Sequence, residues 1–433
     1  MTKITLCPHV DNLASETVAD AHHFVSAVTK LGDTQDVIAQ EDIFASNGMK
    51  LIAKGARINS RMADQLAHHK LVRPLQSFLS TKPVVGGNHF ANDVEHLLAQ
   101  FPLLARTAFR SGDQMAIAHT LVGIDFPPLL AFKLTVMREQ RPALYQKSLT
   151  VALLCLCIGI RSGARGTDLD SYAVAGLCHD LGELYIDPVL LAPEHVINAE
   201  ERRFIYAHPI TGYLTLKEFH QLDPTIARAV WQHHERMDGS GYPYGLSGNA
   251  ISPLGRSLAV ADTIGSVMQN RSHAALLTLL RLNMDKFDPE AIDVMLDVLG
   301  AVGNQGAPIV VNPSWFDLHL LVELLNCWSG YREALQQSPH LDFLVLRMDH
   351  LRMVLTQIGV NPQGFAQLTE LAEQDPTVAA ELQELVDEIH WQIADMEREI
   401  ARHLLEIGDQ LNTRDSQLVH NWLAELPRFV GSA

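Results

Sequence analysis

Six histidine and aspartate residues in the middle of the chain are of the types that hold divalent metal ions. They are His179, Asp180, His208, His233, His234 and Asp262. Asp262 lies in the otherwise apolar stretch L-A-V-A-D-T-I, where a buried carboxylate needs a partner for its charge. A lone helical histidine usually has a structural role in a core. Six such side chains, one or two per helix, could instead converge on two ions inside a helical bundle.

Mixed nitrogen and oxygen ligation suits Fe, Mn, Ni or Zn better than Mg or Ca. Two such ions a few ångströms apart bridge and activate a water molecule and hold a phosphoryl oxygen during in-line displacement. The ligand types therefore indicate hydrolysis of a phosphate ester, and they do not identify the ester.

Helices must position these side chains. Asp223 and Pro224 have the residue types of an N-cap and a first helical residue, so a helix should run from them to His233 and His234. The glycine-rich segment Gly239–Pro243 then predicts a tight turn, which lets a backbone or a substrate come close to the two imidazoles.

The stretch from 130 to 300 shows helical periodicity and no strand pattern, which predicts an all-α bundle. The expected helices run from Pro142 to Ile160, from Asp170 to about Leu181, from a capping box at Asn198 and Glu201 to His208-Pro209, and from Leu258 to Gln269. The fold class is thus mainly α, with an HD-type helical bundle as its core, a small N-terminal β element and a C-terminal helical region. We expect three regions: 1–124, 125–300 and 301–433.

In the N-terminal region, a helix is expected near Glu16–Leu31 and a small β element at about 41–57. Asn47-Gly48 is a strong hairpin signal between Asp42–Phe44 and Leu51–Ala53. A helix should follow from Ser60 to His69. We interpret this region as a docking or dimerisation module.

In the C-terminal region, Asp375-Pro376 should begin a long helix that reaches about Leu411. It carries an apolar stripe at three- and four-residue steps, formed by Leu382, Leu385, Ile389, Ile393, Met396, Ile400 and Leu404. Two interpretations stay open: the helix forms a homodimer or binds a partner, or it packs on its own C-terminal region.

Composition narrows the class of protein. The 433 residues carry a net charge of −17, which argues against a nucleic-acid polymer as partner. The N-terminus lacks signal-peptide features, and the longest apolar run, 151–160, is too short to span a bilayer. Five scattered cysteines suit a reducing compartment. We therefore expect a soluble cytoplasmic protein without a membrane span.

Together, these motifs closely resemble the HD-GYP phosphohydrolases, a branch of the HD superfamily, over about residues 125–300. The resemblance is carried by His179-Asp180, His208-Pro209-x-x-Gly212, the segment H-H-E-R-M-D-G-S-G-Y-P-Y-G-L-S-G, and V-A-D with Arg271 downstream. Members are bacterial all-α domains, many of which hydrolyse cyclic di-GMP to pGpG or GMP on a two- or three-metal centre. The resemblance implies that the six residues above are the metal ligands, with Asp180 bridging. It places Arg271, Gly241, Tyr242 and Pro243 on the substrate side.

Three single positions and one four-residue segment depart from the family pattern. Lys147 replaces its first histidine, Ala143 stands where some members have an additional Glu ligand, Glu183 replaces a lysine that meets a phosphate oxygen, and Arg271-Ser272-His273-Ala274 keeps only the first residue of R-P-Y-R. A protonated Lys147 cannot ligate a metal. Its ammonium could stand in for an ion beside Asp180 and Asp262, or it could bind the phosphate oxygen that Glu183 would repel. Glu183 could equally become a ligand. We take Lys147, Asp180 and Glu183 as the catalytic positions and expect one or two metal ions.

Three hypotheses follow. The favoured one is a metal-dependent cyclic di-GMP phosphodiesterase with weakened or altered activity. The second is a catalytically degenerate protein that responds to cyclic di-GMP or binds a signalling partner. The third is an HD hydrolase that acts on another nucleotide.

Overall fold

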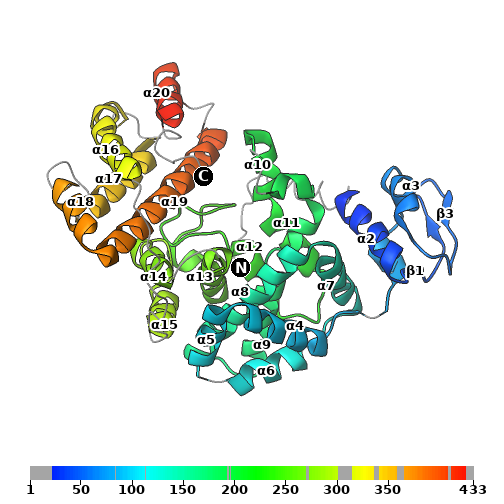
Figure 1. The fold of residues 1–433 in the computed structure, drawn as a ribbon. Helices are drawn as coiled ribbons and strands as arrows, with labels where there is room; N and C mark the ends of the chain where they lie inside the picture. Colours follow the sequence, from blue (N-terminus) through cyan, green and yellow to red (C-terminus); the bar gives the residue numbers. More distant parts are fainter. Residues whose placement is uncertain are drawn as a thin grey trace. The chain divides into compact units, whose positions relative to one another are not determined.

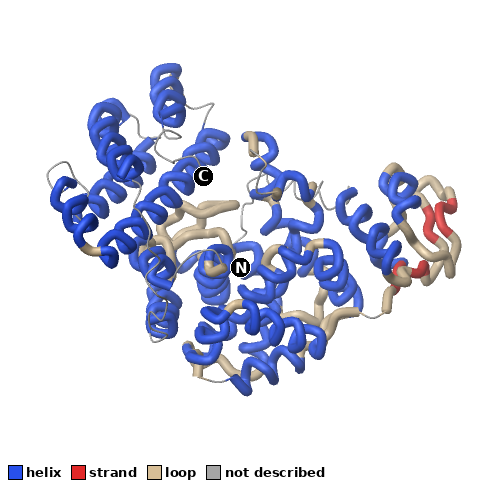
Figure 2. Tube along the Cα trace, viewed as in Figure 1, coloured by secondary structure: helices blue, strands red, loops and turns tan. Residues whose placement is uncertain are grey.

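The computed structural model describes residues 22–82, 84–112, 114–192, 195, 197–269, 273–300, 315–335, 341–357, 365–407 and 411–425. The chain divides into two compact units: unit 1 contains residues 1–270 and 284–302, and unit 2 contains residues 271–283 and 303–433. Both units are built mainly from helices (Figures 1 and 2), which confirms the predicted fold class.

Unit 1 begins with the N-terminal module, which we define as residues 22–82. Its elements are α2 (His22–Thr34), β1 (Ile38–Ala39), β2 (Ile43–Phe44), β3 (Lys50–Ile52), η1 (Ser60–Met62), α3 (Ala63–Ala67), η2 (Leu75–Phe78) and β4 (Leu79–Ser80). β1 pairs with β4 and β2 with β3, both antiparallel. Figure 2 shows these strands gathered beside α2 and α3.

The predicted hairpin is confirmed, because Gly48 turns the chain between β2 and β3 with φ of 85°. That left-handed conformation favours glycine. The predicted helix at 60–69 is a 3₁₀ turn followed by the short α3. Residues 1–21 lie outside the described part of the chain, and so does the predicted start of the first helix near Glu16.

Four helices lead from the module to the bundle: α4 (Gly87–Gln100), α5 (Pro102–Arg110), α6 (Gln114–Gly123) and α7 (Pro128–Gln140). Prolines begin α5 and α7 because the first turn of a helix needs no proline N–H. Asp93 of α4 joins α7, since its carboxylate accepts from Arg138 Nε at 2.7 Å and Nη2 at 2.9 Å. The Tyr145 hydroxyl donates to the same carboxylate at 2.8 Å.

The centre of unit 1 is α8 (Pro142–Arg161), which is buried from Ser148 to Ile160. It packs against α7, α9 (Thr167–Cys178) and α13 (Pro253–Val267). The backbones of α8 and α9 approach closely at Gly176, where a Cβ would lie 2.4 Å from the Ala152 Cα. By length and apolar content α8 would suffice to cross a bilayer, but 78% of its most apolar window is buried inside the protein.

The rest of unit 1 surrounds this helix. In order, the elements are η3 (Leu181–Tyr185), η4 (Pro188–Leu191), α10 (Ala199–Tyr206), α11 (His208–Leu216), α12 (Pro224–Gln232), η5 (Gly248–Ala250), α13 and α15 (Pro289–Gly300). The predicted capping box is confirmed: Asn198 N–H donates to Glu201 at 2.9 Å and Glu201 N–H donates to Asn198 Oδ1 at 2.9 Å. The helix it begins ends at Tyr206. His208-Pro209 opens the next helix, since a proline fits a first turn better than a last one.

Unit 2 consists of α14 (His273–Leu282), α16 (Trp315–Leu335), α17 (Asp342–Gln357), α18 (Phe365–Gln374), α19 (Pro376–Ile407) and α20 (Thr413–Glu425). The apolar stripe of α19 packs inside this unit, in a core that also holds Trp328 and Trp422. α14 packs on α19, and the Asn283 amide donates to the buried Glu388 carboxylate at 2.9 Å. The sequence-based middle region, 125–300, includes residues 271–283, which the structure places in unit 2.

Candidate metal centre

The six predicted ligands come together from the ends of helices and from one helix interior. His179 follows α9 as its C-cap and Asp180 comes next, His208 is the first residue of α11, His233 is the C-cap of α12 with His234 directly after it, and Asp262 lies within α13. α9 ends at Cys178, three residues earlier than predicted, so His179 and Asp180 sit at the step from α9 into η3. We call these six residues the His/Asp cluster.

One side of the cluster is rich in imidazoles. The Asp180 Oδ1 atom lies 3.2 Å from His208 Nε2 and 3.4 Å from His233 Nε2. The two Nε2 atoms lie 3.3 Å apart. With His234, these residues offer four ligand atoms that all lie within 4.8 Å of one another. We call this the imidazole site. Its three nitrogens and one oxygen match the donors that Zn and Fe accept.

The other side is rich in carboxylates. His179 Nε2 lies 2.8 Å from Asp180 Oδ2 and 3.4 Å from Asp262 Oδ1. These three residues form a second group whose ligand atoms lie within 4.8 Å of one another. We call this the carboxylate site. Asp180 belongs to both sites through its two oxygens, which is the arrangement of a bridging carboxylate.

Backbone carbonyls orient three of the rings. The Nδ1 contacts are His179 to Gly176 at 2.8 Å, His208 to Ile205 at 2.6 Å and His233 to Val230 at 2.6 Å. A carbonyl oxygen can only accept, so each Nδ1 carries a proton and each Nε2 faces the cluster. A second partner that fixes the ring in this way is typical of metal-binding histidines.

Two atoms that face the cluster lack a hydrogen bond among the described residues. They are His179 Nε2 and Asp180 Oδ1, and both residues are fully buried. An unsatisfied buried polar atom is costly, and a bound cation would satisfy both. The cluster therefore fits a divalent metal ion in donor types, orientation and unmet bonding capacity.

The charges in the cluster follow from burial and from the two carboxylates. Burial, together with the neighbouring imidazoles, lowers the pKa of His233 to about 4 and holds the pKa of His234 well below its usual value. Burial alone would raise the pKa of Asp180, but the charges of His179 and Lys147 lower it far more. Burial likewise lowers the pKa of His179, yet the Asp180 and Asp262 carboxylates raise it to about 9 overall.

Lys147, from α8, reaches into the carboxylate site. Its Nζ lies 2.7 Å from Asp180 Oδ2 and 2.9 Å from Asp262 Oδ1, and 29% of its side chain remains exposed. Burial acts to lower the pKa of Lys147, but these two carboxylates raise it well above the usual lysine value. Lys147 is therefore an ammonium that pairs with two of the predicted ligands.

Comparison with known proteins places this geometry in a family. Residues 134–291 match the HD domain. The chain is 26% identical over 275 residues to 3′3′-cGAMP-specific phosphodiesterase 1 of Vibrio cholerae, which covers 62% of this chain and 60% of that protein. It is 27% identical over 164 residues to a cyclic di-GMP phosphodiesterase of Pseudomonas aeruginosa, covering 36% and 39%. It is 37% identical over 135 residues to a cyclic di-GMP phosphodiesterase response regulator of Xanthomonas campestris, covering 28% and 35%. In each case the match spans less than two thirds of the relative.

Residues 134–291 form an HD domain of the HD-GYP family.

In the HD-GYP domain, the segment between α12 and η5, residues 233–247, forms the GYP loop. Gly241 packs directly against the backbone of Glu235 and Arg236, because a Cβ at Gly241 would lie 2.3 Å from Arg236 N. The Tyr242 ring stacks on His234 with centroids 4.5 Å apart, and Tyr206 of α10 packs against Tyr242 at 4.4 Å. Tyr242 thus holds the one cluster imidazole for which no carbonyl contact is described. Pro243 is buried in the same loop.

Glu235 organises the GYP loop, although it was not among the site residues predicted from the sequence. Its carboxylate accepts from Tyr244 N–H at 2.8 Å and from Leu246 N–H at 2.8 Å, and it is only 1% exposed. The signal was present as the third residue of H-H-E. A glutamate at that position is equally typical of a further ligand and of a loop anchor, because both uses need a buried carboxylate.

Two other predicted positions have different outcomes. Glu183 lies half-buried in η3, where burial and the Asp180 charge raise its pKa to about 7. His208 and Lys147 act in the opposite direction on the same carboxyl. Arg271 lies outside the described residues, so its predicted substrate contact stays a prediction.

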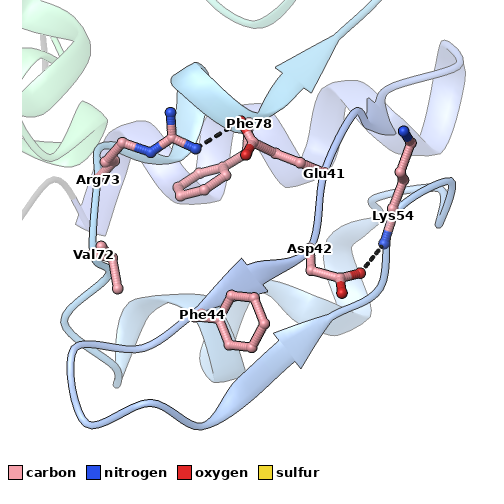
Figure 3. A pocket seen from close by; sticks show the side chains of 7 residues that line it. All are labelled: Glu41, Asp42, Phe44, Lys54, Val72, Arg73 and Phe78. Carbon is pink, nitrogen blue, oxygen red and sulfur yellow. Dashed lines mark hydrogen bonds and ion pairs between the residues drawn. The ribbon is translucent and has the colours of Figure 1, made fainter.

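A hollow of about 350 Å³ opens on the N-terminal module (Figure 3). It is lined by Glu41, Asp42, Phe44, Lys54, Val72, Arg73 and Phe78. Two of its charged groups pair with each other, Arg73 with Glu41 at 2.6 Å, and Asp42 accepts from the Lys54 backbone N–H at 2.7 Å. This hollow lacks the ligand chemistry of the His/Asp cluster, which remains the candidate site.

Proposed function

We propose that this protein is a metal-dependent phosphodiesterase that hydrolyses a cyclic dinucleotide, with cyclic di-GMP as the leading substrate and pGpG or GMP as product. The proposal is carried by the His/Asp cluster, in which inward-facing imidazole nitrogens meet a carboxylate shared between two groups. The names of its relatives support the substrate class, since they act on 3′3′-cGAMP or cyclic di-GMP.

A divalent ion bound here would supply Lewis-acid stabilisation of phosphoryl charge and would lower the pKa of a water molecule. The chain's own residues do the positioning. Asp180 and the three imidazoles of the imidazole site would hold the ion, and the carbonyls behind His208 and His233 keep their rings aimed at it. Tyr242 fixes His234 by stacking. We assign the substrate side to Gly241, Tyr242, Pro243 and Arg271.

A second candidate function is a regulator that binds a cyclic dinucleotide without cleaving it. The observation that favours it is the pairing of Lys147 with Asp180 and Asp262, because both carboxylates then share their charge with an ammonium. The half-buried carboxyl of Glu183 beside the cluster would further oppose an anionic substrate. The Lys147 ion pairs and the Glu183 carboxyl would reduce the rate of cleavage without disrupting the fold.

One experiment separates the two candidates. Purified full-length protein is incubated with cyclic di-GMP or 3′3′-cGAMP in the presence of Mn²⁺ or Fe²⁺, and linear dinucleotide is measured by chromatography. We expect cleavage that Asp180→Asn abolishes and that His195→Gln leaves intact. His195 is a suitable control because it pairs with Glu201 at 3.0 Å, away from the cluster. Binding without cleavage would establish the regulator instead.

The wider setting is also part of the proposal. We propose a cytoplasmic protein of bacterial second-messenger signalling, which works with a signalling partner. The negative charge of −17 is consistent with a partner other than a nucleic-acid polymer. A homodimer through the C-terminal helices would have to use a face other than the α19 stripe, because that stripe packs inside unit 2.

A further inference from the structure

We infer that the ammonium of Lys147 takes the place of a second metal ion, so that this centre binds one divalent cation, in the imidazole site. The inference deepens the proposed function, on which it rests for the presence of any ion. The positive charge in the carboxylate site would then be the Lys147 ammonium, which cannot exchange with the solvent as a metal ion can.

Lys147 lies where a second cation would have to bind. The carboxylate site offers three ligand atoms: His179 Nε2, Asp180 Oδ2 and Asp262 Oδ1. Lys147 Nζ contacts the last two of these at 2.7 and 2.9 Å. A cation in that site would coordinate the same two oxygens at roughly 2.0–2.2 Å. The ammonium and the ion therefore compete for the same oxygen atoms.

The charge of Lys147 acts in the same direction. Lys147 already neutralises one of the two carboxylate charges, and a divalent ion a few ångströms from the ammonium would be repelled in a buried setting. An ammonium offers no lone pair, so it cannot become a ligand while it stays charged. Both effects oppose a cation in the carboxylate site.

The imidazole site is free of this competition. The Lys147 contacts that the structure describes go to Asp180 Oδ2 and Asp262 Oδ1, whereas the imidazole site uses Asp180 Oδ1. That oxygen has no hydrogen-bond partner among the described residues, and the Nε2 atoms of His208 and His233 lie 3.2 and 3.4 Å from it. One side of Asp180 is thus ready for a cation, and the other side is paired.

Metal stoichiometry tests this without any substrate. Wild-type protein, Lys147→His, Lys147→Met and Lys217→His are loaded with MnCl₂, dialysed, and analysed for manganese per chain. Electron paramagnetic resonance then distinguishes an isolated Mn²⁺ from an exchange-coupled pair. Lys217 lies exposed at the end of α11, so its variant controls for metal bound by an added surface imidazole.

We expect one ion per chain in the wild type and in Lys217→His. Lys147→His should bind two, with the signal of a coupled pair. Lys147→Met, which removes the charge without adding a ligand, should gain the second ion at higher Mn²⁺ concentration, and it decides the question if the histidine variant does not fold. A wild type that binds two ions or none, or folded Lys147 variants that gain no ion, would overturn the inference.

The outcomes also separate this inference from the proposed function. If the wild type binds two ions and cleaves cyclic di-GMP, the inference fails and the function stands. If the wild type binds one ion, Lys147→His binds two, and neither cleaves a cyclic dinucleotide, the inference stands and the function fails.

Discussion

At the scale of single residues, Asp180 does two tasks with its two oxygens. Oδ1 faces His208 and His233, and Oδ2 faces His179 and Lys147. A fully buried carboxylate stays ionised here because cationic neighbours outweigh the cost of its burial. This single side chain therefore links the imidazole site to Lys147, the residue that departs from the family pattern.

Replacing Glu183 by glutamine removes the carboxylate charge with little change of side-chain shape. At pH 8, where a carboxyl with a pKa of about 7 is mostly ionised, we expect Glu183→Gln to lower the KM for cyclic di-GMP by about 3- to 10-fold, because a charge interaction of about 1 kcal/mol with the anionic substrate is relieved. The kcat should change less than the KM. Steady-state kinetics of the wild type and of Glu183→Gln would measure both constants. Glu201→Gln, on a surface pair with His195, is the control and should leave KM unchanged. An unchanged KM in Glu183→Gln would show that this carboxyl does not face the substrate.

The candidate site was readable from sequence at the level of residue types. His-Asp and His-His-Glu fall at helix ends, and their low frequency as buried pairs makes them conspicuous. The contacts of Lys147 could not be predicted, because the sequence was equally compatible with an ammonium in place of an ion and with a phosphate ligand until the distances to Asp180 and Asp262 were known.

At the scale of elements, the cluster depends on how closely η3 approaches α11. Gly182 makes this approach: a Cβ there would lie 2.1 Å from the His208 carbonyl oxygen and 3.0 Å from Gly212 N. The glycine two residues after Asp180 thus sets the spacing between two ligand-bearing segments. Any larger residue must push η3 and the start of α11 apart.

We therefore expect Gly182→Ala to lower the free energy of unfolding by about 1–3 kcal/mol and to weaken metal binding. Gly123→Ala is the matched control, because no atom lies within 4 Å of a Cβ added at this last residue of α6. It should change stability by less than about 0.5 kcal/mol. Urea denaturation and Mn²⁺ titration measure both effects. Equal unfolding free energies and equal Mn²⁺ affinities of the two alanine variants would contradict the close approach of η3 to α11.

The link between α4 and α7 gives a prediction for acid stability. Burial raises the pKa of Asp93, but hydrogen bonds from Arg138 and Tyr145 outweigh it and lower the pKa overall. A carboxyl whose pKa is lowered on folding stabilises the fold above its unfolded pKa of about 3.9 and loses this effect as pH falls through the folded value.

Asp93→Asn should therefore cost about 1–3 kcal/mol of unfolding free energy at pH 7. The cost should stay constant down to about pH 5 and shrink below about pH 4. Urea denaturation of wild type and variant at several pH values would show this. Glu139→Gln, on the other side of Arg138, serves as the control and should cost less than about 1 kcal/mol, as surface ion pairs do. If the difference in unfolding free energy between wild type and Asp93→Asn already narrows between pH 7 and pH 5, the effect belongs to another group.

Helix starts were predicted correctly at Pro142, Pro224 and Pro376, whereas α9 and α13 begin three and five residues before the predicted Asp170 and Leu258. Asp223 caps α12 as expected, since its side chain accepts from Thr225 N–H, and the Asn47-Gly48 turn is where the sequence indicated. The ends moved because tertiary contacts decide them: α9 stops at Cys178 so that His179 and Asp180 can enter the cluster. The long C-terminal helix ends at Ile407, four residues before the predicted Leu411, and α20 was not predicted.

At the scale of the whole molecule, the division into units could not be read from the sequence. α14 lies within the sequence stretch that resembles the family, near its C-terminal end, yet it packs on α19 in unit 2. A ten-residue apolar helix carries no mark of which core it will join. In the structure its Leu276, Leu279 and Leu280 are fully buried, and the helix packs on α19.

We predict that a chain ending at Val302 is unstable or aggregates, because α14 would lose α19 and expose these three leucines. Burying each leucine contributes about 1.5–3 kcal/mol. Light scattering and thermal unfolding would test this, with the full-length protein as reference. Adding Leu276→Ser and Leu279→Ser to the shortened chain should restore solubility. A shortened chain that stays monomeric with an unchanged Tm would show that α14 does not need unit 2.

The path of the chain between the two units has a consequence for inheritance. The chain passes from one unit to the other three times, after Asn270, after Asn283 and after Val302. A domain attached at one end of another can be gained or lost by a single cut in the gene. Here a single cut after Val302 would leave α14 without α19, so we expect the C-terminal unit and the HD domain to be inherited together.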